Sequence, residues 1–404
     1  MHNGDFSYYV ALDGPQLDGL IGCAGLLRFD WPSREIAFRY YDGVSSGHNV
    51  SIAPSGKVGL LGNFSQQHVV IDLDTMEEIG RQSTMAFEPV DYRLRSSTHH
   101  LWLDDDRFLC AVGDHLYIFR VSDLSHPEQI GAHGLFNAHE LRWDATHRWV
   151  LMGDLGPEDR AARQVGVFDL ETKKSTVIHL PDTCWHVCVH PSEPIGYAAT
   201  YSVATENEDY VNWAPAYRRE YIFEIDLPAG RIRRTWSSGA EYPIHLNSDL
   251  GVYDGKLYVA SGGSHTVVEV DLADLASTRV LDCKPSLVER ARKAPQELFD
   301  LFAAMARRPT ISNTHFILQA LLVTGGELLD GIYATRVSPD GQYLVTGSRG
   351  YNLLTVWDRR TFNKVYSTTL PTYGRALDKR PWGRMLGAYR RLHLGMHHST
   401  MRAR

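Results

Sequence analysis

One short pattern recurs seven times along this chain of 404 residues and restricts its fold more than any other feature. Each copy is an apolar run of strand-like composition that ends in Asp or, once, in Arg. The copies span residues 26–30, 69–72, 116–120, 165–169, 221–226, 267–271 and 354–358. A repeat spacing of about 40 to 50 residues is typical of arrays in which each unit buries its apolar face against the next. The pattern predicts one closed repeat domain over 1–404, although a chain of this length usually forms two or three domains.

The repeat unit is predicted to contain four short strands joined by polar turns. In the second copy the strand-like segments are 48–56, 58–62, 69–72 and 77–81, the pattern of one propeller blade. The clearest copy contains the turn Ser338-Pro-Asp-Gly and the strand end Val356-Trp-Asp. In both features the chain resembles β-propellers of the WD40 and YVTN type. The resemblance implies an all-β, seven-bladed β-propeller but no activity, because unrelated functions share this fold.

Two departures from the repeat predict how the ring is completed. The N-terminal hairpin at 23–40 has no inner strand ahead of it, whereas 393–401 has the composition of one. We therefore expect the two termini to close one blade together. The interval between Asp271 and Asp358 is about twice the usual length, and the apolar positions of 285–308 have helical spacing. This predicts a helical insertion over about 284–330, placed over the channel mouth.

Composition restricts the partners. Apolar residues make up 43% of the chain, enough for a large core, and the net charge of −7 argues against a nucleic-acid partner, which needs a basic surface. The five cysteines follow neither a disulfide nor a zinc-finger spacing, which indicates a reducing compartment. The sequence has no run of 18 apolar residues and no basic, apolar leader. We expect a cytoplasmic protein whose partner is a small molecule and not a membrane.

Histidine marks the start of six of the seven predicted inner strands. Innermost strands line the channel of a propeller, so equivalent strand starts form a ring at one mouth. The candidate ring residues are His48, His99, His100, His139, His186, His245, His397 and His398. Neutral imidazoles that converge on an axis suit a transition metal, and we expect iron or copper in preference to manganese or zinc. The alternative is a water-filled polar channel.

Three residues beside these histidines carry thiol or carboxyl groups. Cys184 and Cys188 flank His186, and we expect them to be buried structural thiols, because their strand packs against the next blade. Glu140 directly follows His139. Adjacent residues of a strand point to opposite faces, so we do not expect Glu140 to orient His139.

A histidine-lined channel is similar in principle to the channels of three propeller families. They are nitrous-oxide reductase, the copper-dependent methanethiol oxidases of the selenium-binding protein family, and the carotenoid-cleaving dioxygenases, which hold iron with histidines. No family-specific motif of the three is present, so no residue role is carried over. Motifs of serine hydrolases, zinc proteases and nucleotide-binding proteins are absent from the sequence too. We predict a metal-dependent oxidoreductase that acts on a small organic substrate.

Two other functions fit the same pattern. A metal-dependent lyase would use the ion to polarise a carboxylate and a phenol or imidazole as the base. The candidate catalytic residues are Tyr333, at the one blade start without a histidine, and His315, which the predicted insertion brings toward that gap. A non-catalytic interaction platform would carry no metal and would act through its rim.

Overall fold

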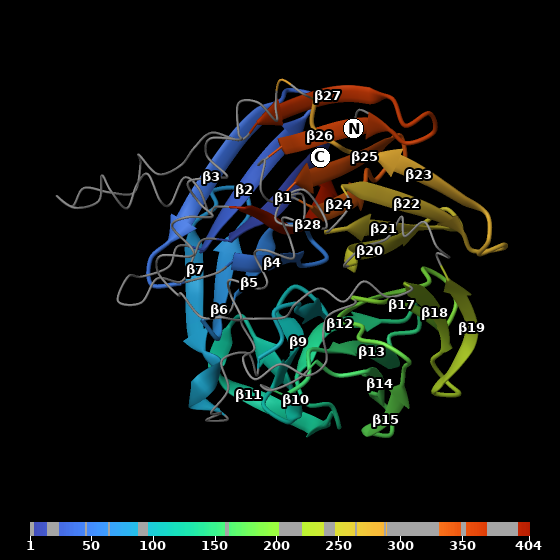
Figure 1. Cartoon of the computed structure of the whole chain (residues 1–404). Helices are drawn as coiled ribbons and strands as arrows, with labels where there is room; N and C mark the ends of the chain where they lie inside the picture. The colour runs from blue at the N-terminus through green and yellow to red at the C-terminus, as the bar shows by residue number, and fades with distance from the viewer. Residues whose placement is uncertain are drawn as a thin grey trace, which may run out of the picture.

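The computed structural model describes residues 4–13, 24–44, 47–63, 65–87, 96–157, 161–201, 220–237, 247–262, 265–286, 288, 331–348, 353–369 and 395–404. Within these residues, seven four-stranded antiparallel sheets are arranged around one axis (Figure 1). The all-β, seven-bladed propeller predicted from the repeat is therefore confirmed.

Each sheet consists of four strands that follow one another from the axis outward. The first sheet contains β28 (Gly395–Ala403), β1 (Phe6–Asp13), β2 (Ala24–Trp31) and β3 (Glu35–Tyr41), and the second contains β4 (Gly47–Ile52), β5 (Val58–Asn63), β6 (Gln67–Asp72) and β7 (Glu78–Ser83). The third contains β8 (Leu101–Trp102), β9 (Arg107–Val112), β10 (His115–Arg120) and β11 (Asp123–Ala132), and the fourth contains β12 (Ala138–Trp143), β13 (Trp149–Asp154), β14 (Gln164–Asp169) and β15 (Lys174–His179). The fifth contains β16 (His186–Val189), β17 (Ile195–Ala199), β18 (Tyr221–Asp226) and β19 (Arg231–Ser237), and the sixth contains β20 (Asn247–Tyr253), β21 (Lys256–Ser261), β22 (Thr266–Asp271) and β23 (Thr278–Asp282). The seventh contains β24 (Ile332–Val337), β25 (Tyr343–Ser348), β26 (Leu353–Asp358) and β27 (Lys364–Thr369).

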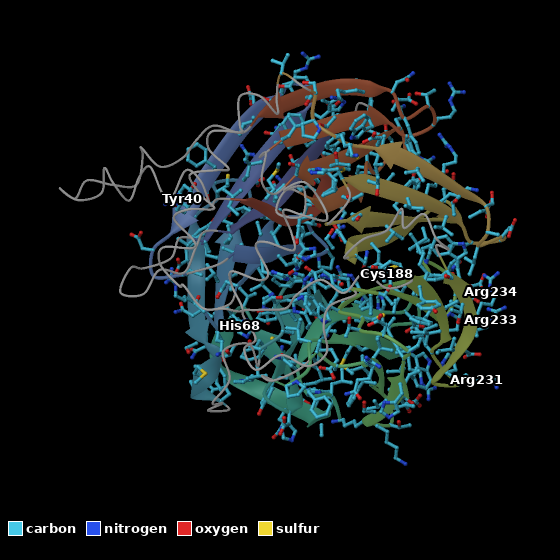
Figure 2. The ribbon with its side chains drawn as sticks, viewed as in Figure 1. Tyr40, His68, Cys188, Arg231, Arg233 and Arg234 are labelled. Atoms are coloured by element: carbon cyan, nitrogen blue, oxygen red, sulfur yellow. The ribbon has the colours of Figure 1, made fainter. Side chains whose placement is uncertain are left out.

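The seven repeated apolar runs correspond to the third strand of each sheet, and the histidines of the described histidine-led segments lie on or just before the first. This order places the histidines near the axis and the most polar strand at the rim. In the fifth sheet, for example, Cys188 lies toward the centre on β16, whereas Arg231, Arg233 and Arg234 lie on β19 at the outer edge (Figure 2).

The two ends of the chain share the first sheet, as predicted. The C-terminal strand β28 pairs antiparallel with β1, so that Phe6 lies opposite Ala403 and Tyr8 opposite Met401. In Figure 1 the red β28 lies against the blue β1. Closure by the chain ends removes the unpaired inner edge that β1 would otherwise expose.

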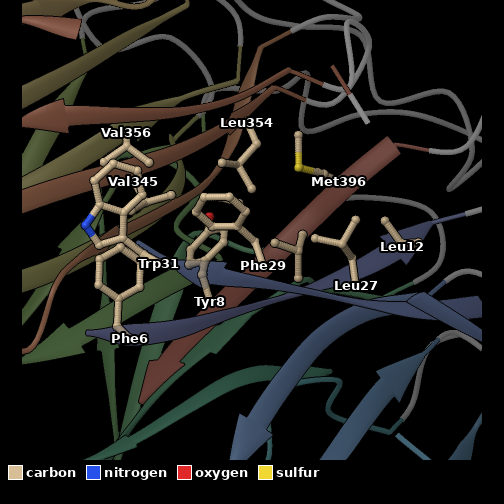
Figure 3. Close-up of a cluster of buried hydrophobic side chains, with 12 residues drawn as sticks. Phe6, Tyr8, Leu12, Leu27, Phe29, Trp31, Val345, Leu354, Val356 and Met396 are labelled. Carbon is tan, nitrogen blue, oxygen red and sulfur yellow. The ribbon is translucent and has the colours of Figure 1, made fainter. Parts of the chain in front are cut away.

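Buried apolar clusters join the sheets into a ring. The described residues form seven such clusters, and each contains residues of two neighbouring sheets. The cluster between the first and seventh sheets packs Phe6, Phe29 and Trp31 against Val345 and Val356 (Figure 3). A ring of seven blades has seven interfaces, so the apolar packing is continuous around the axis.

The helical insertion expected over about 284–330 is not supported. Most of that segment lies outside the described residues, and the named helical element within them is the short 3-10 helix η1 (Thr84–Ala86). The expected position of the insertion over the channel mouth also lies outside the described residues. None of the described helical segments is long and apolar enough to cross a membrane.

Candidate metal centre

Irregular pairing of the inner strands determines which residues face the axis. In five of the seven sheets the register between the inner strand and its neighbour shifts near the start of the repeat. An extra residue of this kind is a β-bulge, which bends the strand and redirects a side chain. The residues at these shifts are His48, His139 with Glu140, Ser248, Tyr333, and His397 with His398. Three of the five bulges therefore fall at candidate histidine ligands.

Five histidines from five blades converge at the axis, and all are buried. They are His48, His99, His139, His186 and His398. Their ring centroids approach to distances between 4.5 Å, for His99 and His398, and 5.8 Å, for His99 and His186. Two overlapping triplets, which share His99, each bring one ligand atom per residue within 4.8 Å of the others. We refer to the five residues as the axial histidines; they can hold a metal ion.

The other candidate residues have different positions. His245 and His315 lie outside the described residues, as does the side chain of His397. Tyr333 is buried at the bulge of β24. His99 and His100 were candidates for the same ring position, and the structure separates them. His99 lies among the axial histidines, whereas His100 contacts His68 in a different group.

Glu140 lies behind two axial histidines and contacts both. Its Oε1 is 3.4 Å from His99 Nδ1, and its Oε2 is 3.3 Å from His186 Nδ1. Oε2 also accepts a hydrogen bond of 2.9 Å from the backbone N–H of Val187, and Arg142 lies 2.5 Å from Oε1. Glu140 thus contacts a histidine in each of the two blades beside its own. The alternation of side chains along a strand does not predict these contacts.

The charge of Glu140 follows from these contacts. Burial by itself raises the pKa of this carboxyl, but Arg142, His99 and His186 together hold the pKa well below its usual range. The ionised carboxylate favours a proton on Nδ1 of each histidine. Nε2 then remains as the lone-pair atom available to a metal, the arrangement found in carboxylate–histidine–metal sites.

Burial keeps the imidazoles of His99 and His139 neutral. It lowers the pKa of His99 to about 4, against the raising effect of Glu140. Burial also lowers the pKa of His139 well below its ordinary value, with further lowering by His99 and His186. Because a metal binds the neutral form, these two ligands need not lose a proton at neutral pH before binding.

A second carboxylate stands near His398. Asp249 Oδ1 lies 3.9 Å from His398 Nδ1, and its Oδ2 accepts hydrogen bonds from Arg336 at 2.6 Å and from the backbone N–H of Thr335 at 3.0 Å. Asp249 belongs to β20, whereas Arg336 belongs to β24. The axial histidines are thus bordered by two carboxylate–arginine pairs, Glu140 with Arg142 and Asp249 with Arg336.

Two glycines allow neighbouring blades to approach closely behind the site. A Cβ on Gly62 in β5 would lie 1.7 Å from the carbonyl oxygen of Thr98, and one on Gly153 in β13 would lie 1.9 Å from that of Trp185. Thr98 and Trp185 immediately precede His99 and His186 in the chain. The two glycines therefore set the positions of two axial histidines without contacting them.

The expectation for the cysteines beside His186 is confirmed. Cys184 and Cys188 are free, buried thiols, and burial raises the pKa of both. They lie in two different apolar clusters, one on each side of the fifth sheet. Neither belongs to a metal-binding group formed by the described residues.

Fold and site together define a seven-bladed β-propeller whose central histidines can hold a metal ion. No family model matches the chain, and no curated protein matches it. Among solved structures, hydrazine synthase of Kuenenia stuttgartiensis is similar at 13% identity and a TM-score of 0.50, over 87% of this chain and 86% of that one. A nidogen/laminin complex is similar at 10% identity and a TM-score of 0.48, over 98% of both chains. At 13% identity the first likeness shows the propeller fold alone.

Proposed function

We propose that this protein is a metal-dependent oxidoreductase that acts on a small organic substrate, with copper or iron bound by the axial histidines. The observation that carries the proposal is the contact of Glu140 with Nδ1 of both His99 and His186. A water-filled channel needs no carboxylate behind its histidines. A metal ligand does, because its tautomer and ring orientation must be fixed.

The donor set is compatible with copper or iron and disfavours metals that prefer oxygen ligands. The two axial triplets consist of histidines, so they offer imidazole nitrogens as ligands. The nearby carboxylates contact Nδ1 atoms, arginines or backbone N–H groups instead. Imidazole suits copper, iron, zinc and nickel, whereas magnesium, calcium and manganese favour carboxylate and water ligands. When bound, copper or iron would supply one-electron chemistry, and the burial of the five ligands would limit the access of water.

In this proposal, side chains of the protein orient the ligands and transfer protons. The pair Glu140 and Arg142 orients His99 and His186, and the pair Asp249 and Arg336 stands beside His398. Tyr333, at the corresponding bulge of a neighbouring blade, is proposed to give or take a proton from the substrate. His315 is proposed for the same task and lies outside the described residues. The net charge of −7 supports a small substrate over a polyanion.

Metal analysis of protein purified without a metal-binding tag tests the proposal. We expect copper or iron near one ion per chain, with an optical or electron-spin-resonance signal of a nitrogen-ligated ion. His99→Ala should lose this signal, whereas His126→Ala, whose side chain is 82% exposed on β11, should retain it. Manganese or calcium at the site would favour the lyase, and protein that binds no metal would favour the interaction platform.

A further inference from the structure

A second group of ligand side chains lies between the second and third blades. His68 belongs to β6, His100 lies just before β8, and Cys110 belongs to β9. One ligand atom of each lies within 4.8 Å of the other two, and all three residues are buried. Figure 2 shows His68 away from the centre of the ring, on the blue sheet that Figure 1 labels β4 to β7.

The two imidazoles are incompletely satisfied. His68 Nδ1 and His100 Nε2 lie 3.0 Å apart and share one hydrogen bond. His68 Nε2 and His100 Nδ1 have no hydrogen-bond partner among the described residues, although both atoms are buried. A buried polar atom without a partner costs on the order of 1 to 3 kcal/mol. If these side chains only filled space in the core, apolar side chains would stabilise the fold more.

The surroundings of the group are apolar and uncharged. The ring of His68 packs on Phe119 and Phe108 at centroid distances of 4.4 and 5.2 Å. Cys110 Sγ lies 3.3 Å from the hydroxyl of Ser97. Among the described residues, no carboxylate, lysine or arginine influences the protonation of these three ligands. Among the described residues, only the ligands themselves are therefore available to balance the charge of an ion bound here.

Charge balance selects the ion. Two neutral imidazoles and one thiolate carry a single negative charge, so a monovalent ion gives a neutral complex, whereas Zn²⁺ would leave one uncompensated positive charge in an apolar space. Thiolate is a soft ligand that favours copper(I). We propose that His68, His100 and Cys110 bind one copper(I) ion at a site separate from the axial histidines. Binding replaces the thiol proton of Cys110, which leaves to solvent, and the oxidation state of copper does not change.

The position of His100 links the two sites through the backbone. His99 and His100 are consecutive, and their side chains point to different groups, one axial and one between blades. A copper(I) ion held by His100 would therefore fix the short segment that carries His99. The second site does not depend on the proposed function of the first, because it shares no ligand with the axial triplets.

Anaerobic titration of chelator-treated, full-length protein with copper(I), against a bathocuproine disulfonate competitor, tests the site. The protein used should carry His99→Ala and His186→Ala, so that the axial group is weakened and failure of one site is distinguishable from failure of the other. We expect one copper(I) per chain with sulfur in its X-ray absorption spectrum. Adding Cys110→Ser or His68→Phe should weaken binding by more than the tenfold to about 100-fold that is typical of losing an outer-shell partner, because each removes a ligand itself. Cys283→Ser, which removes a buried thiol in the sixth blade, should leave it unchanged.

Three results would overturn the proposal. They are unchanged copper(I) affinity after Cys110→Ser, a copper spectrum without sulfur, and Zn²⁺ bound by this group in preference to copper(I). If adding Cys110→Ser prevents folding, as a thermal melt would reveal, the spectrum of the His99→Ala, His186→Ala protein loaded with one equivalent of copper(I) decides. Sulfur as a ligand there supports the site, and nitrogen alone contradicts it.

Discussion

The Nε2 atoms of His48 and His139 face each other 3.1 Å apart at the channel axis. At this distance the two rings can share a single proton, so at least one of them presents a lone pair toward the other. Protonation of both would place two positive charges in a buried space. A bound metal ion would resolve the same conflict by accepting both lone pairs, and this pair is therefore one of the places where metal binding should change the structure most.

Removal of the Glu140 charge should weaken metal binding without unfolding the protein. Glu140→Gln keeps the size of the side chain but no longer favours a proton on Nδ1 of His99 and His186. Loss of such a partner typically costs tenfold to a hundredfold in metal affinity. Metal competition with a chelator measures the change, and a thermal melt checks the fold.

Glu269→Gln is the matched control for that variant. Glu269 is also buried and paired, with Arg279 at 3.3 Å and Tyr258 at 2.8 Å, but it belongs to β22, the third strand of its sheet. It should retain full metal affinity. Equal metal affinities of Glu140→Gln and Glu269→Gln would show that Glu140 does not support metal binding.

The repeat in the sequence was sufficient to predict the fold because propeller blades differ little in their strand pattern. The runs that end at Asp72 and Asp358 became third strands, and closure by the termini followed from one missing inner strand. The helical insertion was inferred from the long interval between Asp271 and Asp358 and from the helical spacing of apolar positions, without a partner surface that would require a helix there. Most of that segment lies outside the described residues, and the insertion has no support within them.

The axial site was predictable only in part, because its geometry depends on bulges and on contacts between blades. Period-two alternation assigns Glu140 to the face opposite His139, which gives no reason to connect it with His99 or His186. His68 and Cys110 lie on third and second strands, where a sequence pattern indicates core and not ligands. The sequence feature that could have identified His68 is its polarity. A histidine at the start of an otherwise apolar run needs a hydrogen-bond partner or a metal ion for its ring nitrogens.

Gly153→Ala should disturb the metal centre from a distance. The added methyl group would lie 1.9 Å from the carbonyl oxygen of Trp185, far inside contact distance, so the start of β16 with His186 must move. We expect destabilisation of about 1 to 3 kcal/mol, typical of overpacking, together with weaker metal binding. Urea unfolding and chelator competition measure the two effects. Gly251→Ala is the control, because its Cβ would meet nothing within 4 Å, and a loss of metal in that variant would count against a specific role for Gly153.

Truncation before β28 should unfold the whole ring. Without residues 395–404, the first sheet loses its inner strand and His398, and the buried pairing of β1 is exposed. We expect a chain that ends at residue 391 to lack a cooperative thermal transition, whereas a chain that ends at Met401 keeps the Tyr8–Met401 pairing and melts cooperatively. Circular dichroism during heating distinguishes them. A shortened chain that melts like the full one would show that closure by the termini is dispensable.

Acid should destabilise the metal-free protein, and the sign follows from the buried histidines. Burial lowers the pKa of His99 to about 4 and that of His100 to about 3, from an ordinary value of 6.5. Between those values the unfolded chain binds protons that the folded chain does not, so stability is fully present above pH 6.5 and falls as the pH decreases. Each such histidine contributes a slope of up to about 1.4 kcal/mol per pH unit. Urea unfolding of chelator-treated protein between pH 6 and 4 should therefore show a shallower slope for His100→Gln than for the unmodified chain, while the exposed control His126→Gln should not differ from it. Identical slopes for all three proteins would mean that His100 is protonated equally in the folded and unfolded states.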